Sequence, residues 1–107
     1  MIDQAKLLSS VGGSLPVLRQ LIAEFRQDAG PLMDELAGGV AKNDAKAVHR
    51  AAHTFKGMVS FFGVAPLAEV ALHLEKMGAS GDCTQADEKL VAFRRELERL
   101  QADLDTI

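Results

Sequence analysis

Two histidines, a lysine and a glycine share one face of a predicted helix near the middle of the chain. His49 and His53 are four residues apart, and Lys56 and Gly57 follow His53 by three and four residues. In an α-helix these spacings place side chains one turn apart on the same face. A neutral imidazole is a nucleophile near neutral pH, and a nearby ammonium group stabilises the charge of a phosphoryl group that the imidazole accepts. The pattern therefore favours phosphoryl transfer through His53.

Gly57 is an unfavourable residue for the interior of a helix. A glycine there costs about 1 kcal/mol relative to alanine, because it loses more backbone freedom on folding. Its presence indicates that something large approaches the helix closely at this position. Two explanations are compatible with it: an incoming partner protein, or a second helix of the same chain.

The opposite side of the same helix is apolar. Its members recur at helical spacing and are Val48, Ala51, Ala52, Phe55, Met58, Val59 and Phe62. Because this stripe must face the core, the histidines cannot share it. We therefore expect the side chain of His53 to face solvent.

The rest of the chain also reads as helical, and no segment alternates as a strand does. Turn-forming residues divide it into a short helix over 3–8 and longer helices over 14–40, 45–62, 66–78 and 84–104. Gly30 followed by Pro31 predicts that the second of these five stops or kinks. Four amphipathic helices with short loops bury their stripes most simply against each other. We expect an all-α fold, an antiparallel four-helix bundle with a short additional N-terminal helix, in a single domain over residues 1–107.

The predicted ends of these helices rest on capping residues. The expected N-caps are Asp3, Ser14 and Asp44. Thr84 and Asp87 have the spacing of a capping box and are expected to open the last helix. Gly78 is expected to end the helix before it.

The stretch from Ala52 to Gly63 resembles the signature of the histidine phosphotransfer (HPt) family. That signature reads H-x-[LF]-K-G with a glycine six residues later, and here the sequence is His53-Thr-Phe-Lys-Gly57 followed by Gly63. The family also has a Leu-Glu or Leu-Gln pair in the next helix, matched by Leu74-Glu75. The resemblance in length, order and helix count covers essentially the whole chain.

The resemblance implies a role for each matched residue. His53 would be phosphorylated on Nε2, and Lys56 would neutralise the phosphoryl group. Gly57 would leave room for the incoming partner. Glu75 would accept a hydrogen bond from Nδ1–H of His53 and so fix the tautomer of the ring.

An apolar patch around His53 is expected to dock the partner. Phe61, Ala68 and Leu72 lie off the core stripes of their helices and could form it, while His49 and Ser60 would border it. Phe61 departs from the small or polar residue that the family often has at this position. Simple packing at a helix edge is therefore an equal explanation for Phe61.

Composition narrows the class of function. A net charge of −3 argues against nucleic-acid binding, which needs clustered Lys and Arg. The chain has no apolar run long enough to cross a membrane. Its first residues lack the basic start and apolar stretch of a secretory signal peptide, and its single cysteine is Cys83. These features predict a cytoplasmic protein without direct membrane contact.

The chain is expected to be a phosphoryl carrier and not an enzyme with its own ATP site, because it lacks a G-x-x-x-x-G-K-[ST] loop. By the resemblance its partners are the receiver domains of response regulators or hybrid kinases. It would work in a multistep two-component phosphorelay, as a monomer and without a cofactor. A free-standing protein and a domain of a hybrid sensor kinase are both compatible with the sequence.

Two other interpretations compete with phosphoryl transfer. His49 and His53 have a spacing that can bind zinc from one helix face, but no third ligand accompanies them, so no metal site is expected. The second is a non-catalytic scaffold or dimerisation bundle in which His53 is incidental. Acid-labile labelling of His53 would separate this scaffold from a phosphotransfer module.

Overall fold

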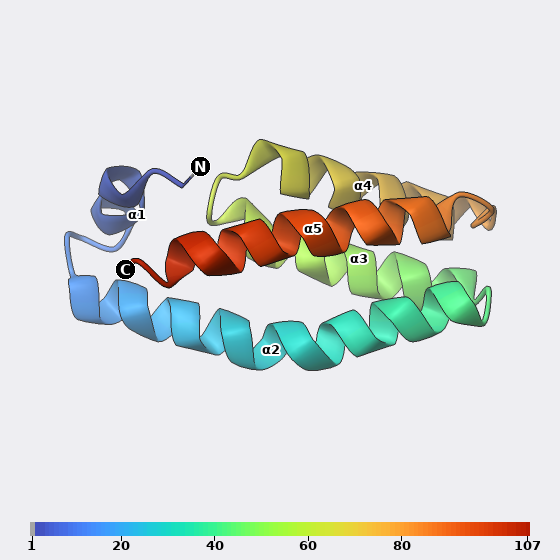
Figure 1. Ribbon diagram of the computed structural model, residues 1–107, viewed down its shortest axis with the longest axis horizontal. Coiled ribbons are helices and arrows are strands. Elements are labelled where there is room, and N and C mark those ends of the chain that lie inside the picture. The colour runs from blue at the N-terminus through green and yellow to red at the C-terminus, as the bar shows by residue number, and fades with distance from the viewer. Residues whose placement is uncertain (1) are drawn as a thin grey trace.

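The computed structural model describes residues 2–107, and within that range it contains helices and no strands. The five helices are α1 (Gln4–Ser10), α2 (Leu15–Ala41), α3 (Ala45–Ser60), α4 (Ala65–Ser80) and α5 (Ala86–Leu104). Figure 1 shows α2 to α5 running in alternating directions along the bundle, with α1 folded beside one end. The described chain measures 42 × 21 × 20 Å along its principal axes. The prediction of a four-helix bundle with a short N-terminal helix is confirmed. None of the helices described is long and apolar enough to cross a membrane.

Three helices begin where side chains can replace the missing backbone acceptors. The side chains of Asp3, Ser14 and Asp44 each accept a hydrogen bond from the backbone N–H three residues later. Such caps are worth about 1 kcal/mol each. The three predicted N-caps are therefore confirmed, and the cap at Asp44 fixes the start of the helix that carries His53.

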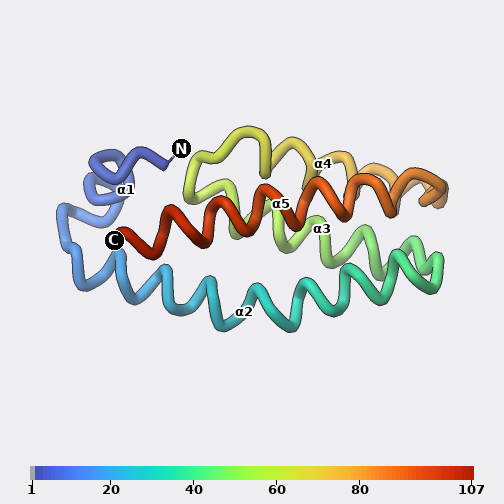
Figure 2. The backbone as a smooth tube through the Cα atoms, in the orientation of Figure 1, coloured from blue at the N-terminus to red at the C-terminus, as the bar shows by residue number. Residues whose placement is uncertain are grey.

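Of the two outcomes predicted at Gly30 and Pro31, a stop or a kink, the stop is wrong, because α2 is one continuous helix with Pro31 inside it. Proline removes one helical hydrogen bond and crowds the preceding turn. Ala29 before it and Leu36 after it are nevertheless both buried in the same core. Burial of the two halves on one side outweighs the local cost, and the tube of α2 bows along its length around the bundle (Figure 2).

The prediction that Gly78 ends α4 is wrong. The helix continues to Ser80, and its C-cap is Gly81, which has a left-handed backbone conformation with a φ of 80°. Gly78 instead lies where α4 crosses α3. A Cβ atom on it would lie 2.3 Å from the backbone nitrogen of His49 and 2.7 Å from the carbonyl oxygen of Ala45. The glycine is thus explained by close contact between two backbones and not by a helix end.

The predicted capping box of Thr84 and Asp87 is also wrong. α5 begins at Ala86, and its N-cap residue, Gln85, makes no side-chain cap hydrogen bond. The hydroxyl of Thr84 donates to Asp82 at 2.8 Å, within the turn before the helix. The hydroxyl of Thr84, which the sequence pattern assigned to a helix cap, therefore hydrogen-bonds within the preceding turn instead.

The core is formed by the apolar stripes of the four long helices, and α3 packs in it against both α2 and α4. Fully buried members include Phe55 and Val59 of α3, Leu74 of α4 and Phe93 of α5. The rings of Phe55 and Phe93 meet edge to face with centroids 4.8 Å apart. Because one side of α3 is held in this way, its other side must point outward.

Candidate functional site

His53 stands on the outward side of α3. Its side chain is 65% exposed, although Ala52 and Phe55 on either side of it are completely buried. The predicted exposure of the ring is therefore observed. An imidazole in this position can be reached by a second macromolecule without any change in the bundle.

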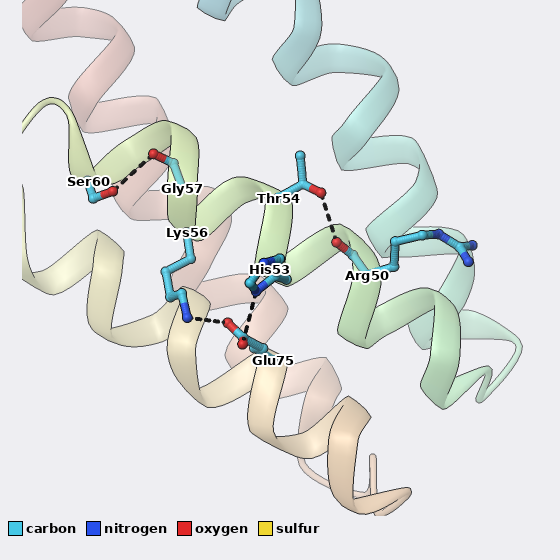
Figure 3. Close-up of polar contacts among 7 residues, drawn as sticks. All are labelled: Arg50, His53, Thr54, Lys56, Gly57, Ser60 and Glu75. Carbon is cyan, nitrogen blue, oxygen red and sulfur yellow. Dashed lines mark hydrogen bonds and ion pairs between the residues drawn. The ribbon is translucent and has the colours of Figure 1, made fainter.

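Glu75 of α4 joins His53 and Lys56 in one polar network, drawn in Figure 3. The Nδ1 atom of His53 lies 3.1 Å from Oε1 of Glu75, and Nζ of Lys56 lies 2.7 Å from Oε2 of the same carboxylate. Glu75 is the least accessible of the three, with 15% of its side chain exposed. The carboxylate is thus fixed from two sides, and it links α3 to α4 beside the exposed ring.

The electrostatics of the network keep Glu75 ionised. The hydrogen bond from Lys56 is the largest effect and lowers the pKa of Glu75 from its ordinary value of 4.5, while the hydrogen bond from His53 lowers it further. Partial burial acts in the opposite direction and is outweighed. Since an ionised carboxylate can only accept hydrogen bonds, the Nδ1 atom of His53 must carry the proton, which leaves the lone pair on Nε2.

Gly57 faces open space one turn beyond His53. A Cβ atom added to it would meet nothing within 4 Å. The explanation that Gly57 allows a close contact between helices of this chain is therefore wrong. The remaining explanation is an approach from outside the chain.

His49 lies one turn before His53 on the same face. The two rings are stacked, with centroids 6.2 Å apart and an angle of 17° between their planes. Among residues 2–107, no group of three side chains is arranged to hold a metal ion. Ser60, one turn beyond Gly57, donates its hydroxyl to the carbonyl oxygen of Gly57 at 2.9 Å, so its side chain is bound to its own helix.

The residues predicted to form a single docking patch do not all line the same hollow. Phe61 is 37% exposed and lines a hollow toward α2, together with Gly57. Ala68 and Leu72 belong to α4 and are half-buried, and neither lines that hollow. The structure therefore brings His53, Lys56 and Glu75 together, and of the three apolar residues predicted to dock the partner only Phe61 lines the hollow beside Gly57.

Sequence reasoning missed the contribution of α2 to this region. The hollow beside Gly57 is also lined by Leu21, Glu24, Phe25 and Asp28. Glu24 and Asp28 are spaced four residues apart, and Glu35 follows Asp28 by seven, so all three fall on one flank of the helix. That repeat of acidic residues is the signal that could have revealed them.

An antiparallel helical bundle that presents one exposed, carboxylate-oriented histidine defines the class of histidine phosphotransfer modules. Residues 20–103 match the Hpt domain family, and the chain belongs to that family. Its fold is similar to that in the crystal structure of histidine-containing phosphotransfer protein B (HptB) from Pseudomonas aeruginosa PAO1. That match has a TM-score of 0.88 and 24% sequence identity, and it covers 98% of this chain and 91% of the other. No curated protein sequence matches the chain significantly. The chain is a histidine phosphotransfer module of the kind used in phosphorelays, as the sequence predicted.

Proposed function

We propose that His53 is the residue of this module that carries the phosphoryl group, and that it exchanges the group with aspartates of receiver domains. The observation that carries the proposal is the exposed ring of His53 with its Nδ1 atom 3.1 Å from Glu75. The other two histidines lack this arrangement. His49 has no hydrogen-bond partner among the described residues, and the Nδ1 atom of His73 is buried without one.

The network gives each residue a part in the transfer. The lone pair of Nε2 attacks the phosphorus of the receiver's aspartyl phosphate, and the N–P bond forms as the bond to the aspartate oxygen breaks. The electron pair leaves with the aspartate carboxylate. The proton stays on Nδ1, and Glu75 offsets the positive charge that the ring gains. The reverse sequence returns the group to an aspartate.

Lys56 and Gly57 complete the site. Lys56 stands three residues beyond His53 with its ammonium 2.7 Å from Glu75, close enough to turn toward a phosphoryl group on Nε2. Gly57 leaves the surface open where the receiver must approach. In this proposal the chain is a phosphoryl carrier, and nucleotide and metal chemistry belong to its partners.

The proposal includes a monomer in which all 107 residues act as one HPt domain. A monomer follows most simply because the four apolar stripes are buried against each other within one bundle. The proposal also includes a cytoplasmic location, which is compatible with the single free thiol of Cys83.

The test is transfer of radioactive phosphate from a phosphorylated receiver domain to the chain. We expect a label that is lost in acid and kept in base, as a phosphorylated histidine is. His53→Gln should abolish the label, and the matched control His73→Gln should keep it. Labelling of His53→Gln at the parent's level would overturn the assignment of His53 and would favour a scaffold in which His53 is incidental.

A further inference from the structure

Two adjoining hollows follow the boundary between α2 and α3 and reach Thr54 and Gly57, which neighbour His53 on α3. The first, of about 230 Å³, includes Gly57, and the second, of about 270 Å³, includes Thr54. Both are also lined by Asp28 and Met58, so they form one continuous groove. This α2–α3 groove is lined by Leu21, Glu24, Phe25, Asp28, Pro31, Leu32, Glu35, Thr54, Gly57, Met58, Phe61 and Phe62.

The floor of the α2–α3 groove is apolar and partly accessible. Phe61 has 37% of its surface exposed, and its ring meets that of the buried Phe62 edge to face at 5.1 Å. Met58, assigned to the core from its spacing, is half-buried at the groove. An exposed aromatic ring and a flexible thioether beside an open groove are typical of a surface that receives another protein.

The α2 side of the groove is acidic. The side chains of Glu24, Asp28 and Glu35 lie on exposed residues, and none forms an ion pair or a hydrogen bond with another described residue. The nearest arginine along α2, Arg26, is paired with Asp105 of α5 at 2.6 Å and so does not neutralise them. Three carboxylates without an ion-pair partner among the described residues therefore border an apolar floor.

We propose that the three carboxylates on the α2 side of the α2–α3 groove select the receivers that this chain accepts, by favouring a docking helix that carries Lys or Arg. The inference rests on the proposed role of His53. The occupant is an amphipathic helix of the receiver domain, with apolar side chains over Met58 and Phe61 and a basic side chain against Glu24 and Asp28. Gly57 belongs both to the groove and to the face of His53, so a helix seated there brings its domain to the phosphoryl group.

The two parts of the groove contribute differently to this selection. Burial of apolar area over Met58 and Phe61 stabilises any receiver helix of suitable shape. Charge complementarity speeds encounter and penalises receivers that present an acidic helix. The carboxylates therefore determine which receivers bind, and the apolar residues of the groove determine the affinity of binding.

The test compares phosphoryl transfer from a panel of receiver domains of the same organism, each phosphorylated with acetyl phosphate. The receivers are ranked by the Lys and Arg content of the helices that border their phosphorylated aspartate. The variant is the triple change Glu24→Gln, Asp28→Asn and Glu35→Gln, which removes charge with little change of shape. The control is Asp34→Asn, an exposed carboxylate of α2 that lines neither hollow.

We expect the triple variant to slow transfer from the most basic receivers roughly 10-fold at low salt and to lose most of the salt dependence of the rate. Transfer from acidic receivers should rise or stay equal, and Asp34→Asn should match the parent throughout. Equal rates for the parent and the triple variant with basic receivers would overturn the proposal.

A small phosphoryl donor separates this inference from the role of His53. Phosphoramidate needs no docking surface, so it should label His53 equally in the parent, the triple variant and Asp34→Asn. If phosphoramidate labels His53 but receivers ignore the charge of the groove, the docking inference fails and the role of His53 stands. If receivers label the His53→Gln variant to the same level as the parent, the proposed role of His53 is wrong, and the docking inference that rests on it is wrong too.

Discussion

Lys56 and Glu75 form an ion pair of 2.7 Å beside His53, so the ammonium expected to meet the phosphoryl group is held by the carboxylate that orients the ring. One residue comes from α3 and the other from α4. When His53 gains a phosphoryl group, the ammonium has two anions within reach. Lys56 can therefore serve the resting site and the phosphorylated site in turn.

Replacing Lys56 tests this double role. Lys56→Gln removes the positive charge, and we expect receiver-to-histidine transfer to slow about 10-fold, the effect of one charge-assisted hydrogen bond of about 1.5 kcal/mol. Single-turnover transfer measures it. Lys42→Gln, at the far end of α2, is the control and should transfer like the parent. A Lys56→Gln rate equal to the parent's would show that the ammonium does not act on the phosphoryl group.

Glu75 is expected to act through the tautomer of His53. Glu75→Gln keeps an oxygen that can accept from Nδ1–H, whereas Glu75→Ala removes it. We expect Glu75→Ala to slow transfer about 10-fold and Glu75→Gln to slow it less. Nitrogen-15 shifts of the His53 ring should report a protonated Nδ1 in the parent and a mixture of tautomers in Glu75→Ala. The same tautomer in all three proteins would rule out the orienting role.

The lowered pKa of Glu75 predicts a particular dependence of stability on pH. Its pKa in the folded state lies below the ordinary value of 4.5, mainly because of Lys56. The ionised carboxylate therefore contributes its full stabilisation above pH 4.5, and this contribution is lost as the pH falls through the folded-state pKa. The stabilisation of the parent that comes from ionised Glu75, which Glu75→Gln lacks, should shrink as the pH falls below 4.5.

A carbon-13 titration of the Glu75 carboxyl checks the cause of that shift. In Lys56→Gln we expect the pKa of Glu75 to rise, because burial is then opposed by His53 alone. In Lys42→Gln it should stay where it is in the parent. A titration of Glu75 that does not respond to loss of Lys56 would contradict the assigned cause.

Gly57 should show a conflict between stability and function. Because its Cβ position is open and lies within α3, Gly57→Ala should raise the unfolding free energy by about 1 kcal/mol, measured by urea denaturation. The same change should slow transfer from a receiver while leaving labelling by phosphoramidate intact. Gly38→Ala, at a helical glycine of α2 with equally open surroundings, should gain similar stability without loss of transfer. Unchanged receiver transfer in Gly57→Ala would remove the argument for close approach.

The sequence predicted those features that depend on local periodicity. The apolar stripe of α3 set the outward direction of His53, and the caps at Asp3, Ser14 and Asp44 depend on groups only three residues away. The network of His53, Lys56 and Glu75 required the family resemblance as well, because Glu75 lies on another helix.

The incorrect predictions share a physical cause. Pro31, Gly78 and Thr84 each carry a strong local preference, and in each case a contact outside the predicted pattern decided the outcome. Core burial keeps α2 continuous through Pro31, and the crossing with α3 requires Gly78 inside α4. The acidic repeat of α2 marked one side of the α2–α3 groove, but its floor was missed because residues of two helices form it together.

The contact at Gly78 connects the packing of α4 to the chemistry of His53. Gly78 lies one turn after Glu75, and the residue it approaches, His49, lies one turn before His53. In Gly78→Ala the new Cβ would meet backbone atoms at 2.3 to 2.7 Å, so α3 and α4 must separate there. We expect a loss of roughly 3 kcal/mol in unfolding free energy, as for an overpacked core, whereas Gly38→Ala should gain stability. The separation should also lengthen the bond between His53 and Glu75, and the nitrogen-15 shifts of the His53 ring should move toward those of Glu75→Ala. A Gly78→Ala protein as stable as the parent, with its ring shifts unchanged, would show that α3 and α4 can part at this crossing without disturbing the site.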